Sequence, residues 1–529
     1  MTERPRRRPP PIPSSPDSAT SAKKRRTASR GIQLRVENRP LPGATSDLDR
    51  LRQEARAGFA GLGVSFLLHG AFLLVLAMLV YSTGAGEAEI NGLIASFLSP
   101  EQVAREKAAQ VRAPVQIASV PNLPNATPSP DAPKPKPAEE MPAPAKAGET
   151  TIGRPPKVEK ALTGREGTRR TALLQLFGGT KDTEGAVNRG LSWLARVQNS
   201  DGRWELHRGY DDPGQTGLRT DTGATALALL CFLGAGETHL QGKHRTVVSK
   251  ALDWLKGVQK PNGDLHDSEE FGRQPAFYAH GQATIALLEA YAMTRDDSLR
   301  EPAERALQYI YNSQSELGGW RYQPNSAGDL SVTGWQVMAM QTARMAGLEV
   351  PEAVLNRARA FLDTVSSEDG SRYRYQPTDP LTNETAAMTA EGLLCRMYLG
   401  WPKDHPALQS GVEYLLKPQH LPRWREGERN VYHWYYATQV MHHLEGDAWK
   451  IWNDEMAQVI TSNQVRTGKM NGSWHPTRPR GAFLEYGDQA GRLYVTCMCI
   501  LTLETYYRHL PLYRDADALD AEAVSAVEN

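Results

Sequence analysis

Residues 187–204 read VNRGLSWLARVQNSDGRW, and the same order of residue types returns five more times along the chain. An apolar or aromatic pair, here Trp193-Leu194, is followed after three intervening residues by a glutamine or serine, and in most copies by a glycine turn that an aromatic residue closes. The glutamine or serine occupies positions 198, 259, 314, 366, 419 and 464, so successive copies are 45 to 61 residues apart. Repeats of this length are supersecondary units that bury their apolar faces only against their neighbours.

Each repeat predicts two helices of different character. The first carries the apolar pair on one face and is amphipathic, as in residues 187–197. The second is apolar nearly all round and therefore belongs in an interior. These second segments are Thr222–Leu233, Gly281–Ala292, Val332–Ala346, Ala386–Leu399, Trp434–Leu444 and Ala490–Tyr506. One amphipathic and one buried helix per repeat predict an all-α fold of two concentric rings.

The glycine, glutamine and tryptophan positions are predicted to hold the repeats together. A glycine such as Gly202 or Gly319 supplies the positive φ that ends a helix. The amide of a glutamine can bond free backbone groups at the end of the next helix, and an indole can cover the turn. We therefore expect structural roles for these residues rather than ligand contacts.

Composition divides the chain unevenly. Its 529 residues carry a formal net charge of +1, but residues 1–56 hold 14 Lys and Arg against 6 Asp and Glu. This basic, Pro- and Ser-rich stretch is expected to be a disordered cytoplasmic tail. The remainder is net acidic, which argues against a main domain that binds nucleic acid.

Residues 57–83 are predicted to form a single transmembrane helix. Residues 57–81 read AGFAGLGVSFLLHGAFLLVLAMLVY, an apolar run long enough to cross a ~30 Å hydrocarbon core. Arginines precede the run and glutamates follow it, which places the N-terminus in the cytoplasm and the rest outside. The expected location is a bacterial inner membrane with a periplasmic C-terminal domain. A cleavable signal peptide is the alternative, disfavoured by the long segment before the run.

Residues 84–165 are interpreted as a juxtamembrane segment and a Pro-rich linker. Twelve prolines lie between Ala113 and Lys157. Such a segment adopts extended, polyproline-like conformations and acts as a spacer that reaches on the order of 140 Å at ~3.1 Å per residue. The repeats then fill residues 166–512, and residues 513–529 form an acidic tail.

The four cysteines all fall in predicted helices of the repeats. They are Cys231, Cys395, Cys497 and Cys499. We interpret them as small buried hydrophobes rather than as a disulfide or a metal site. The sequence contains no Cys-x-x-Cys, His-Glu-x-x-His or P-loop pattern. No metal or cofactor is therefore expected.

The spacing of aromatic, Gln, Gly and Trp residues resembles the QW-type repeats of squalene-hopene cyclases and the related repeats of protein prenyltransferase β-subunits. The resemblance covers roughly residues 170–512. It implies a closed (α/α)6 toroid with a central cavity that the inner helices line.

The catalytic motifs of both families are not retained. Squalene-hopene cyclases protonate an alkene with an Asp-x-Asp-Asp-Thr-Ala motif, and the best match, residues 329–334, keeps Asp329 but holds Ser331 and Val332 at the next two acids. Prenyltransferases bind zinc with a histidine at a position where this chain has Val495. An apolar side chain cannot bind zinc. The resemblance therefore implies the toroid and neither reaction.

A second resemblance lies in the apolar run. Residues 65–71, with Ser65 and His69 four apart, look like the Ser-x-x-x-His transmembrane motif of TonB-type energy transducers. Residues at this spacing share one helix face, and an ionisable residue in a membrane helix indicates a functional site. The resemblance implies that this face docks on a proton channel complex like ExbB/ExbD. A tolerated polar residue at a helix contact is the alternative.

Polar residues in the first turns of the inner helices are expected to lie together around one opening of the toroid cavity. The carboxylates considered for catalysis are Asp221, Asp329, Glu384 and Asp488. The competing interpretation is that such residues cap the helix N-termini without any ligand. Asp488 and Arg492 are four residues apart, so a simple salt bridge is equally consistent with their spacing.

Aromatic residues and histidines of the inner helices are candidates for ligand binding. The set is His280, Trp335, His433, Trp434, Tyr435 and Arg492, and Phe277 and Tyr436 could extend an aromatic wall suited to isoprenoid chains or sugar faces. A histidine on an inner helix can equally be a core residue whose ring nitrogens are satisfied.

The sequence thus predicts a membrane-anchored, extracytoplasmic toroid that binds an apolar or amphipathic, isoprenoid- or lipid-like ligand, or a partner segment, in its cavity. One alternative is a glycan hydrolase or lyase, whose two carboxyl groups should lie roughly 5–10 Å apart. The other is an energy-coupled adaptor that works through Ser65 and His69.

Overall fold

The computed structural model describes residues 161–165, 167–207, 210, 218–266, 275–377, 384–519, 521 and 522. They all belong to one compact unit, residues 140–529. The expectations for residues 1–56, 57–83 and most of 84–165, including those for Ser65 and His69, lie outside this part of the chain. Within it, no helix is both long and apolar enough to cross a membrane.

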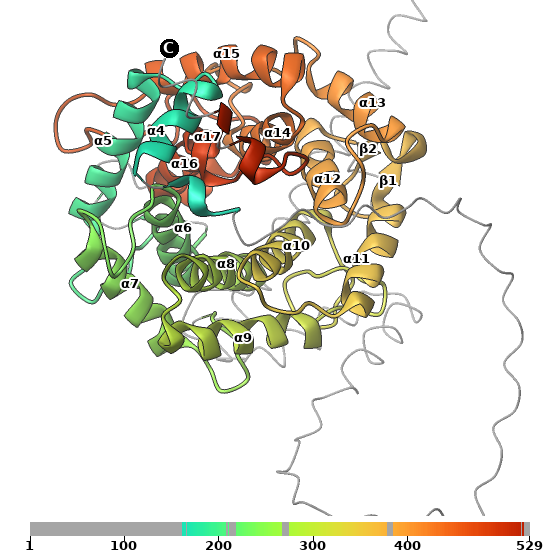
Figure 1. Cartoon of the computed structure of the whole chain (residues 1–529), viewed down its shortest axis with the longest axis horizontal. Coiled ribbons are helices and arrows are strands. Elements are labelled where there is room, and N and C mark those ends of the chain that lie inside the picture. Colours follow the sequence, from blue (N-terminus) through green and yellow to red (C-terminus); the bar gives the residue numbers. More distant parts are fainter. Residues whose placement is uncertain are drawn as a thin grey trace, which may run out of the picture. The chain divides into compact units, whose positions relative to one another are not determined.

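The described residues form two rings of helices, one inside the other (Figure 1). The outer helices are α5 (Lys181–Val197), α7 (Arg245–Val258), α9 (Asp297–Asn312), α11 (Glu352–Val365), α13 (Pro406–Leu415) and α15 (Gly446–Ser462). The inner helices are α6 (Asp221–Gly234), α8 (Ala276–Thr294), α10 (Leu330–Met345), α12 (Ala386–Tyr398), α14 (Val431–Leu444) and α16 (Gly487–Leu503). The squalene cyclase-like all-α toroid predicted from the repeat is confirmed.

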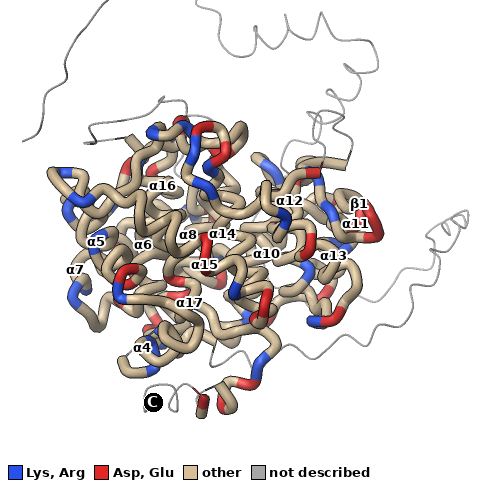
Figure 2. Tube along the Cα trace, turned by 90° about the horizontal axis from the view of Figure 1, so that it is seen from above, with Lys and Arg blue, Asp and Glu red and all other residues tan. Residues whose placement is uncertain are grey.

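Short elements complete the unit. The turn η2 (Thr163–Arg165) and helix α4 (Gly167–Leu176) precede the rings, and α17 (Thr505–Arg508) follows α16. Figure 2 shows α4 and α17 toward one end of the rings. In the fourth repeat, the strands β1 (Ser366–Ser367) and β2 (Arg372–Tyr373) form an antiparallel pair around the turn η3 (Glu368–Gly370).

Burial agrees with the prediction of amphipathic outer helices and fully buried inner helices. Outer helix α5 buries the stripe that includes Val187, Leu191 and Leu194, whereas fifteen of the sixteen residues of inner helix α10 are buried. The core therefore lies between the rings and inside the inner one.

The glutamine staples predicted from the sequence are present. Gln198 Nε2 donates to the carbonyl oxygens of Gly202 in its own turn and of Val247 in the next outer helix, both at 2.9 Å. Gln259 and Gln314 make the corresponding pair of bonds in their repeats. Each staple thus joins a glycine carbonyl of its own turn to a carbonyl within the next outer helix.

The last staple closes the ring. Gln464 Nε2, from the segment after α15, donates to Gly472 O at 2.9 Å and to Ala186 O of α5 at 2.8 Å. Arg189 Nε of α5 donates back to Gln464 Oε1 at 2.9 Å. The first and last outer helices are thus joined by the same device that joins consecutive repeats.

The indoles of the turns also act as predicted. The indole N–H of Trp204, Trp320 and Trp474 donates to a carbonyl of its own outer helix at 2.8–2.9 Å. Gly202 has the predicted positive φ, at +101°, but in the third repeat the positive φ lies at Gly318 rather than at the predicted Gly319. Gly318 has φ +89°, and a Cβ there would lie 1.9 Å from Arg357 O. Only glycine fits so close an approach of a turn to the backbone of the next outer helix.

Several helix boundaries differ from the sequence prediction, and among the inner helices the differences are largest in the second and sixth repeats. Helix α8 begins at Ala276 rather than Gly281, because Phe277 lies buried and stacked on Tyr309 in its first turn. Tertiary packing overrides the weak helix propensity of aromatic residues there. The predicted helix over residues 490–506 is divided at Glu504 into α16 and α17.

Candidate functional site at the rim of the second repeat

The end of the inner ring at which the helices terminate is closed by buried charges. Arg165 of η2 donates to both carboxylate oxygens of Glu289 at 2.8 and 3.1 Å, and Arg508 Nη2 donates to Glu289 Oε1 at 3.0 Å. Although burial alone would raise the pKa of Glu289, the two guanidinium groups hold it below its ordinary value. Burial raises the pKa of the neighbouring Glu504 to about 8.

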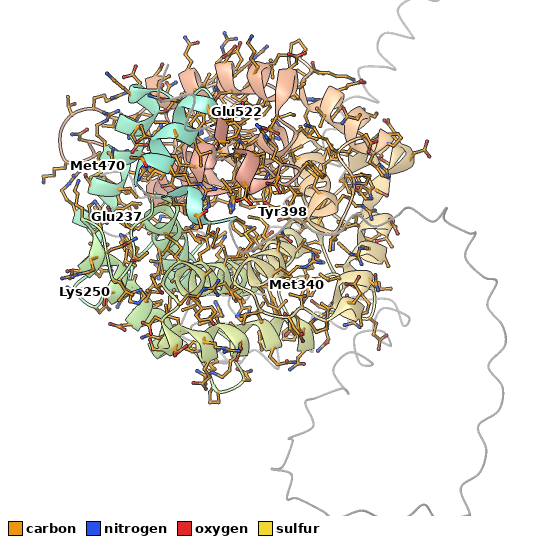
Figure 3. All side chains as sticks on the ribbon, in the orientation of Figure 1. Glu237, Lys250, Met340, Tyr398, Met470 and Glu522 are labelled. Atoms are coloured by element: carbon orange, nitrogen blue, oxygen red, sulfur yellow. The ribbon has the colours of Figure 1, made fainter. Side chains whose placement is uncertain are left out.

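Beside this network, side chains fill the axis of the inner ring. The cavity that remains there holds about 10 Å³ and is lined by Ile285, Met338, Met345, Tyr398 and Tyr435, among others. Tyr398 extends from α12 toward the middle of the ring (Figure 3). A volume of this size has room for about one water molecule. This end of the barrel is therefore plugged.

At the opposite end, the helix N-termini carry a buried carboxyl group. Asp329 caps α10 by accepting from Val332 N at 2.8 Å, which confirms the capping interpretation. Its other oxygen accepts from Tyr375 Oη at 2.9 Å and faces Arg321 Nε at 3.4 Å. Burial nevertheless raises the pKa of Asp329 to about 7. The group is thus able to carry a proton near neutral pH.

Glu391 is a second buried acid of this end that the sequence reasoning missed. Its Oε2 accepts from Tyr432 Oη at 2.9 Å, and burial raises its pKa well above the ordinary value. The signal that could have found it is a carboxylate inside an otherwise apolar inner helix. Glu289 and Glu504 share this signal.

The larger of the two cavities characterised among the described residues lies on the rim of this end. It holds about 180 Å³ and is lined by Asp264, Ala276, Phe277, His280, Tyr309, Tyr322, Gln323 and Pro324. Phe277 stacks on Tyr309 with ring centroids 5.7 Å apart, and His280 meets Tyr309 edge-on at 4.8 Å. We call this space the rim cavity. It has an aromatic wall and polar groups at its edge.

Two phenols connect the rim cavity to Asp329. Tyr322 lines the cavity, and its Oη lies 2.6 Å from Tyr375 Oη. Tyr375 in turn donates to Asp329. The protonatable carboxyl group and the wall of the cavity therefore belong to one hydrogen-bonded chain.

The rim cavity occurs where the repeat departs from its own pattern. In four repeats the turn's aromatic residue donates its backbone N–H to a threonine on the inner helix: Trp204 to Thr225, Trp320 to Thr333, Tyr373 to Thr389 and Trp474 to Thr496. In the second repeat Leu265 replaces the tryptophan and His280 replaces the threonine, with Leu265 N donating to His280 Nδ1 at 3.2 Å. The second repeat therefore has an aliphatic side chain where these four repeats have an indole or a phenol ring.

His280 is held neutral by this position. Its Nδ1 accepts from Leu265, so its Nε2 carries the proton and donates to Ala306 O at 3.1 Å. Burial lowers the pKa of His280 to about 4, although Asp264 opposes the shift. Its ring forms part of the cavity wall, and its two nitrogens are used in hydrogen bonds to the backbone of Leu265 and Ala306.

The other candidate carboxylates lie in separate local contacts. Asp221 pairs with Arg203 at 3.0 Å, and Glu384 pairs with Arg374 at 2.8 Å. A hydrogen bond from Ser367 and the Arg374 charge hold the pKa of Glu384 below its ordinary value. Asp488 lies in the first turn of α16. These contacts bind Asp221 and Glu384 each to its own turn.

The candidate aromatic residues divide into separate packing groups. Trp335 stacks on Tyr435 with centroids 5.8 Å apart, inside the inner ring. His433 meets Trp452 of α15 edge-on at 5.6 Å and lies 3.1 Å from His420 O through Nε2. The remaining two make the contacts Trp434–Trp424, 6.0 Å between centroids, and Arg492 Nη1–Ser473 Oγ, 3.0 Å. Only His280 of the predicted set lines the rim cavity, together with Phe277.

The cysteines are buried and unpaired, as expected for small hydrophobic side chains. Among the residues with described placement, no group of three His, Cys, Asp or Glu side chains is arranged to hold a metal ion.

Comparison with known proteins agrees with the repeat. The family model of the squalene-hopene cyclase C-terminal domain matches residues 168–278. Squalene-hopene cyclase of Bradyrhizobium diazoefficiens is 25% identical over 284 residues, which are 48% of this chain and 42% of the relative. A probable squalene-hopene cyclase of Sinorhizobium fredii is 24% identical over 276 residues, 46% of this chain and 42% of the relative. The chain spans less than half the length of these relatives.

Solved structures with similar folds include two kinds of enzyme. One is an inactive variant of the α-1,6-mannanase GH76A of Salegentibacter sp. HEL1_6, with a TM-score of 0.43 and 12% identity, covering 61% of this chain and 99% of the other. Another is a variant of the type II terpene cyclase MstE from Scytonema, with a TM-score of 0.42 and 13% identity, covering 64% of this chain and 99% of the other.

Proposed function

We propose that the chain is a membrane-tethered, squalene cyclase-like toroid that binds a small or amphipathic ligand at the rim cavity, without terpene cyclase chemistry. The observation that carries the proposal is the place of the open space. It lies at the rim of the irregular second repeat, whereas side chains and paired charges fill the axis at the other end of the barrel.

Two features argue against a cyclase. The positions of the second and third acids hold Ser331 and Val332, and the Ser331 hydroxyl is hydrogen-bonded to Tyr278 Oη. A neutral hydroxyl group is far too weak an acid to protonate an alkene. The rim cavity, at about 180 Å³, is also smaller than the ~300–1,000 Å³ of sites that enclose drug-sized ligands.

A two-carboxylate hydrolase has less support. Such an enzyme needs one acid that donates a proton and a second close by. Asp329 holds its proton near neutral pH, and Asp221 and Glu384 are engaged with arginines of their own turns. Burial raises the pKa of Glu391, the other buried acid of this end, so it does not supply the charged partner either. Release of sugar from a glycan that binds the rim cavity would reverse this order of preference.

Tethering is part of the proposal because of the apolar run at residues 57–81. The chain should remain with the membrane pellet after extraction with alkaline carbonate, and deletion of residues 57–81 should release it. Pelleting that survives this deletion would remove the tether from the proposal.

We also propose that the Ser65 and His69 face of the tether docks on an ExbB/ExbD-like proton channel, because an ionisable residue in an apolar run is costly without a partner. The variant His69→Leu should then lose co-purification with that channel. Unchanged co-purification would eliminate the adaptor role and leave ligand binding untouched.

Ligand binding is tested by filling the rim cavity. Ala276 is the first residue of α8 and lines the cavity, so Ala276→Phe should occupy it. Ala386 is the first residue of α12, has similar partial exposure and lies outside the cavity lining, so Ala386→Phe is the matched control. Native mass spectrometry of the full chain in detergent, against panels of lipids and glycans, should find a ligand that the first variant loses and the control keeps. No such ligand would overturn the proposal.

A further inference from the structure

We propose that the rim cavity is a sugar site that takes one pyranose ring of a glycan or glycoconjugate. This inference rests on the proposed function and names its ligand class. It is carried by the wall, the charge balance, the size and the openness of the cavity.

The wall of the rim cavity is aromatic. Phe277, Tyr309 and Tyr322 line it, and the buried Phe277 fixes Tyr309 by stacking on it. The C–H face of a pyranose packs against aromatic rings, whose apolar bodies and polar tips suit an amphipathic ligand. An aliphatic chain would satisfy this wall too, so the polar groups decide between the two ligands.

The polar edge of the cavity carries no net charge. Asp264 Oδ2 accepts from Lys260 Nζ at 2.8 Å, and Asp264 Oδ1 accepts from His266 N at 3.0 Å. An ammonium ligand would meet a carboxylate whose charge Lys260 already balances. Hydroxyl groups, in contrast, can donate to the carboxylate and accept from an amide such as that of Gln323, which also lines the cavity. Sugar hydroxyls therefore fit this edge better than a cation or a hydrocarbon does.

The size of the cavity limits the ligand to one ring. Its volume of about 180 Å³ is well above the ~10–15 Å³ that one water molecule needs and below the ~300–1,000 Å³ of sites that enclose drug-sized ligands. Gln323 and Pro324 at its border are exposed, so the rest of a longer glycan can extend into solvent. The site would therefore bind one sugar unit of a longer glycan.

The irregularity of the second repeat supplies an independent reason to place a ligand here. In the first, third and sixth repeats an indole covers the turn and donates to the outer helix, and Leu265 makes neither contact in the second. Natural sequences break their own local rules mainly where function requires it. The same repeat carries Asp264 next to its turn glycine, where the first, third and sixth repeats have Arg203, Gly319 and Ser473.

The test uses the full chain in detergent and methyl hexopyranosides and their disaccharides as probes, with saturation-transfer NMR and a titration for the dissociation constant. At least one probe should bind. Ala276→Phe should weaken its binding by about tenfold or more, Tyr309→Leu by about fivefold, and Ala386→Phe by less than about twofold. Circular dichroism and the melting temperature identify any variant that fails to fold. Asp264→Asn, which keeps the turn acceptor, then serves as a second probe of the polar edge and should also weaken binding.

The possible outcomes separate this inference from the proposed function. Binding of a fatty acid or isoprenoid that Ala276→Phe abolishes, with no sugar bound, would overturn the sugar site and leave the binding toroid standing. Sugar binding that both Phe variants keep would place the site elsewhere and overturn the inference. Absence of any ligand lost in Ala276→Phe would overturn both.

Discussion

At the scale of single residues, Asp329 meets two opposing demands. As the N-cap of α10 it accepts hydrogen bonds, which favour its charged form, while full burial disfavours that form. Burial is the stronger effect and raises its pKa to about 7. The sequence could offer both the capping and the catalytic interpretation of this residue, but it could not show Tyr375, which comes from another repeat.

This pKa makes a prediction for stability against pH. Between pH 4 and pH 7 the folded chain holds the Asp329 proton more tightly than the unfolded chain does, so this residue's contribution to stability falls as the pH rises. Asn still caps the helix but does not titrate. The free energy of unfolding of Asp329→Asn, minus that of the wild type, should therefore increase from pH 4.5 to pH 8 by on the order of 2–4 kcal/mol.

Urea titrations at several pH values measure this difference. Glu384→Gln is the control of opposite sign and is measured from about pH 6 down to about pH 3, because the pKa of Glu384 is lowered and its stabilising contribution is lost only as the pH falls through that range. A difference for Asp329→Asn that stays flat, or that decreases with pH, would contradict the buried, protonatable carboxyl group.

At the scale of elements, the hydrogen bonds between neighbouring repeats are made by the residues that recur in the sequence repeat. A glutamine after each of several outer helices joins its own turn to the next helix, and Gln464 applies the device to α5. These bonds were predictable because they repeat with the sequence. The partners of Arg165 were not, because η2 precedes the first repeat and has no counterpart in the others.

The variant Gln464→Ala should open the closure of the ring. It removes the bond to Ala186 of α5, leaves the carbonyl of Gly472 without its buried donor and removes the acceptor of Arg189. We expect a loss of about 2–3 kcal/mol in the free energy of unfolding. Gln308→Ala, at an exposed site of α9, should change it by less than about 0.5 kcal/mol. Equal effects of the two changes would show that the staple does not hold the ring closed.

The variant Arg165→Ala should loosen the plugged end of the barrel. It removes one of the two guanidinium groups that neutralise the fully buried Glu289, which predicts a loss of about 3–5 kcal/mol. Arg300→Ala breaks an exposed pair with Glu304 and should cost less than about 0.5 kcal/mol. Thermal and urea unfolding compare the two. A small loss for Arg165→Ala would mean that Arg508 alone suffices for Glu289.

At the scale of the whole molecule, the sequence predicts the two rings of helices much better than it predicts the rim cavity. The period of the repeat and the polarity of each helix predict two rings, because the apolar pattern of a helix alone indicates whether it belongs to the outer or the inner ring. The rim cavity depends on side-chain volumes from three segments distant in sequence, around Asp264, Phe277 and Tyr309. Leu265 stands in the sequence where four other repeats have an aromatic residue, but only the structure shows that Asp264, next to it, lines the rim cavity.

The most direct test of the account is a crystal structure of the toroid soaked with the tightest-binding methyl hexopyranoside. We expect density for one ring in the rim cavity, with a C–H face against Tyr309 or Tyr322 and a hydroxyl group within hydrogen-bond distance of Asp264. Ligand density on the barrel axis beside Tyr398 and Tyr435, with the rim cavity empty, would contradict it.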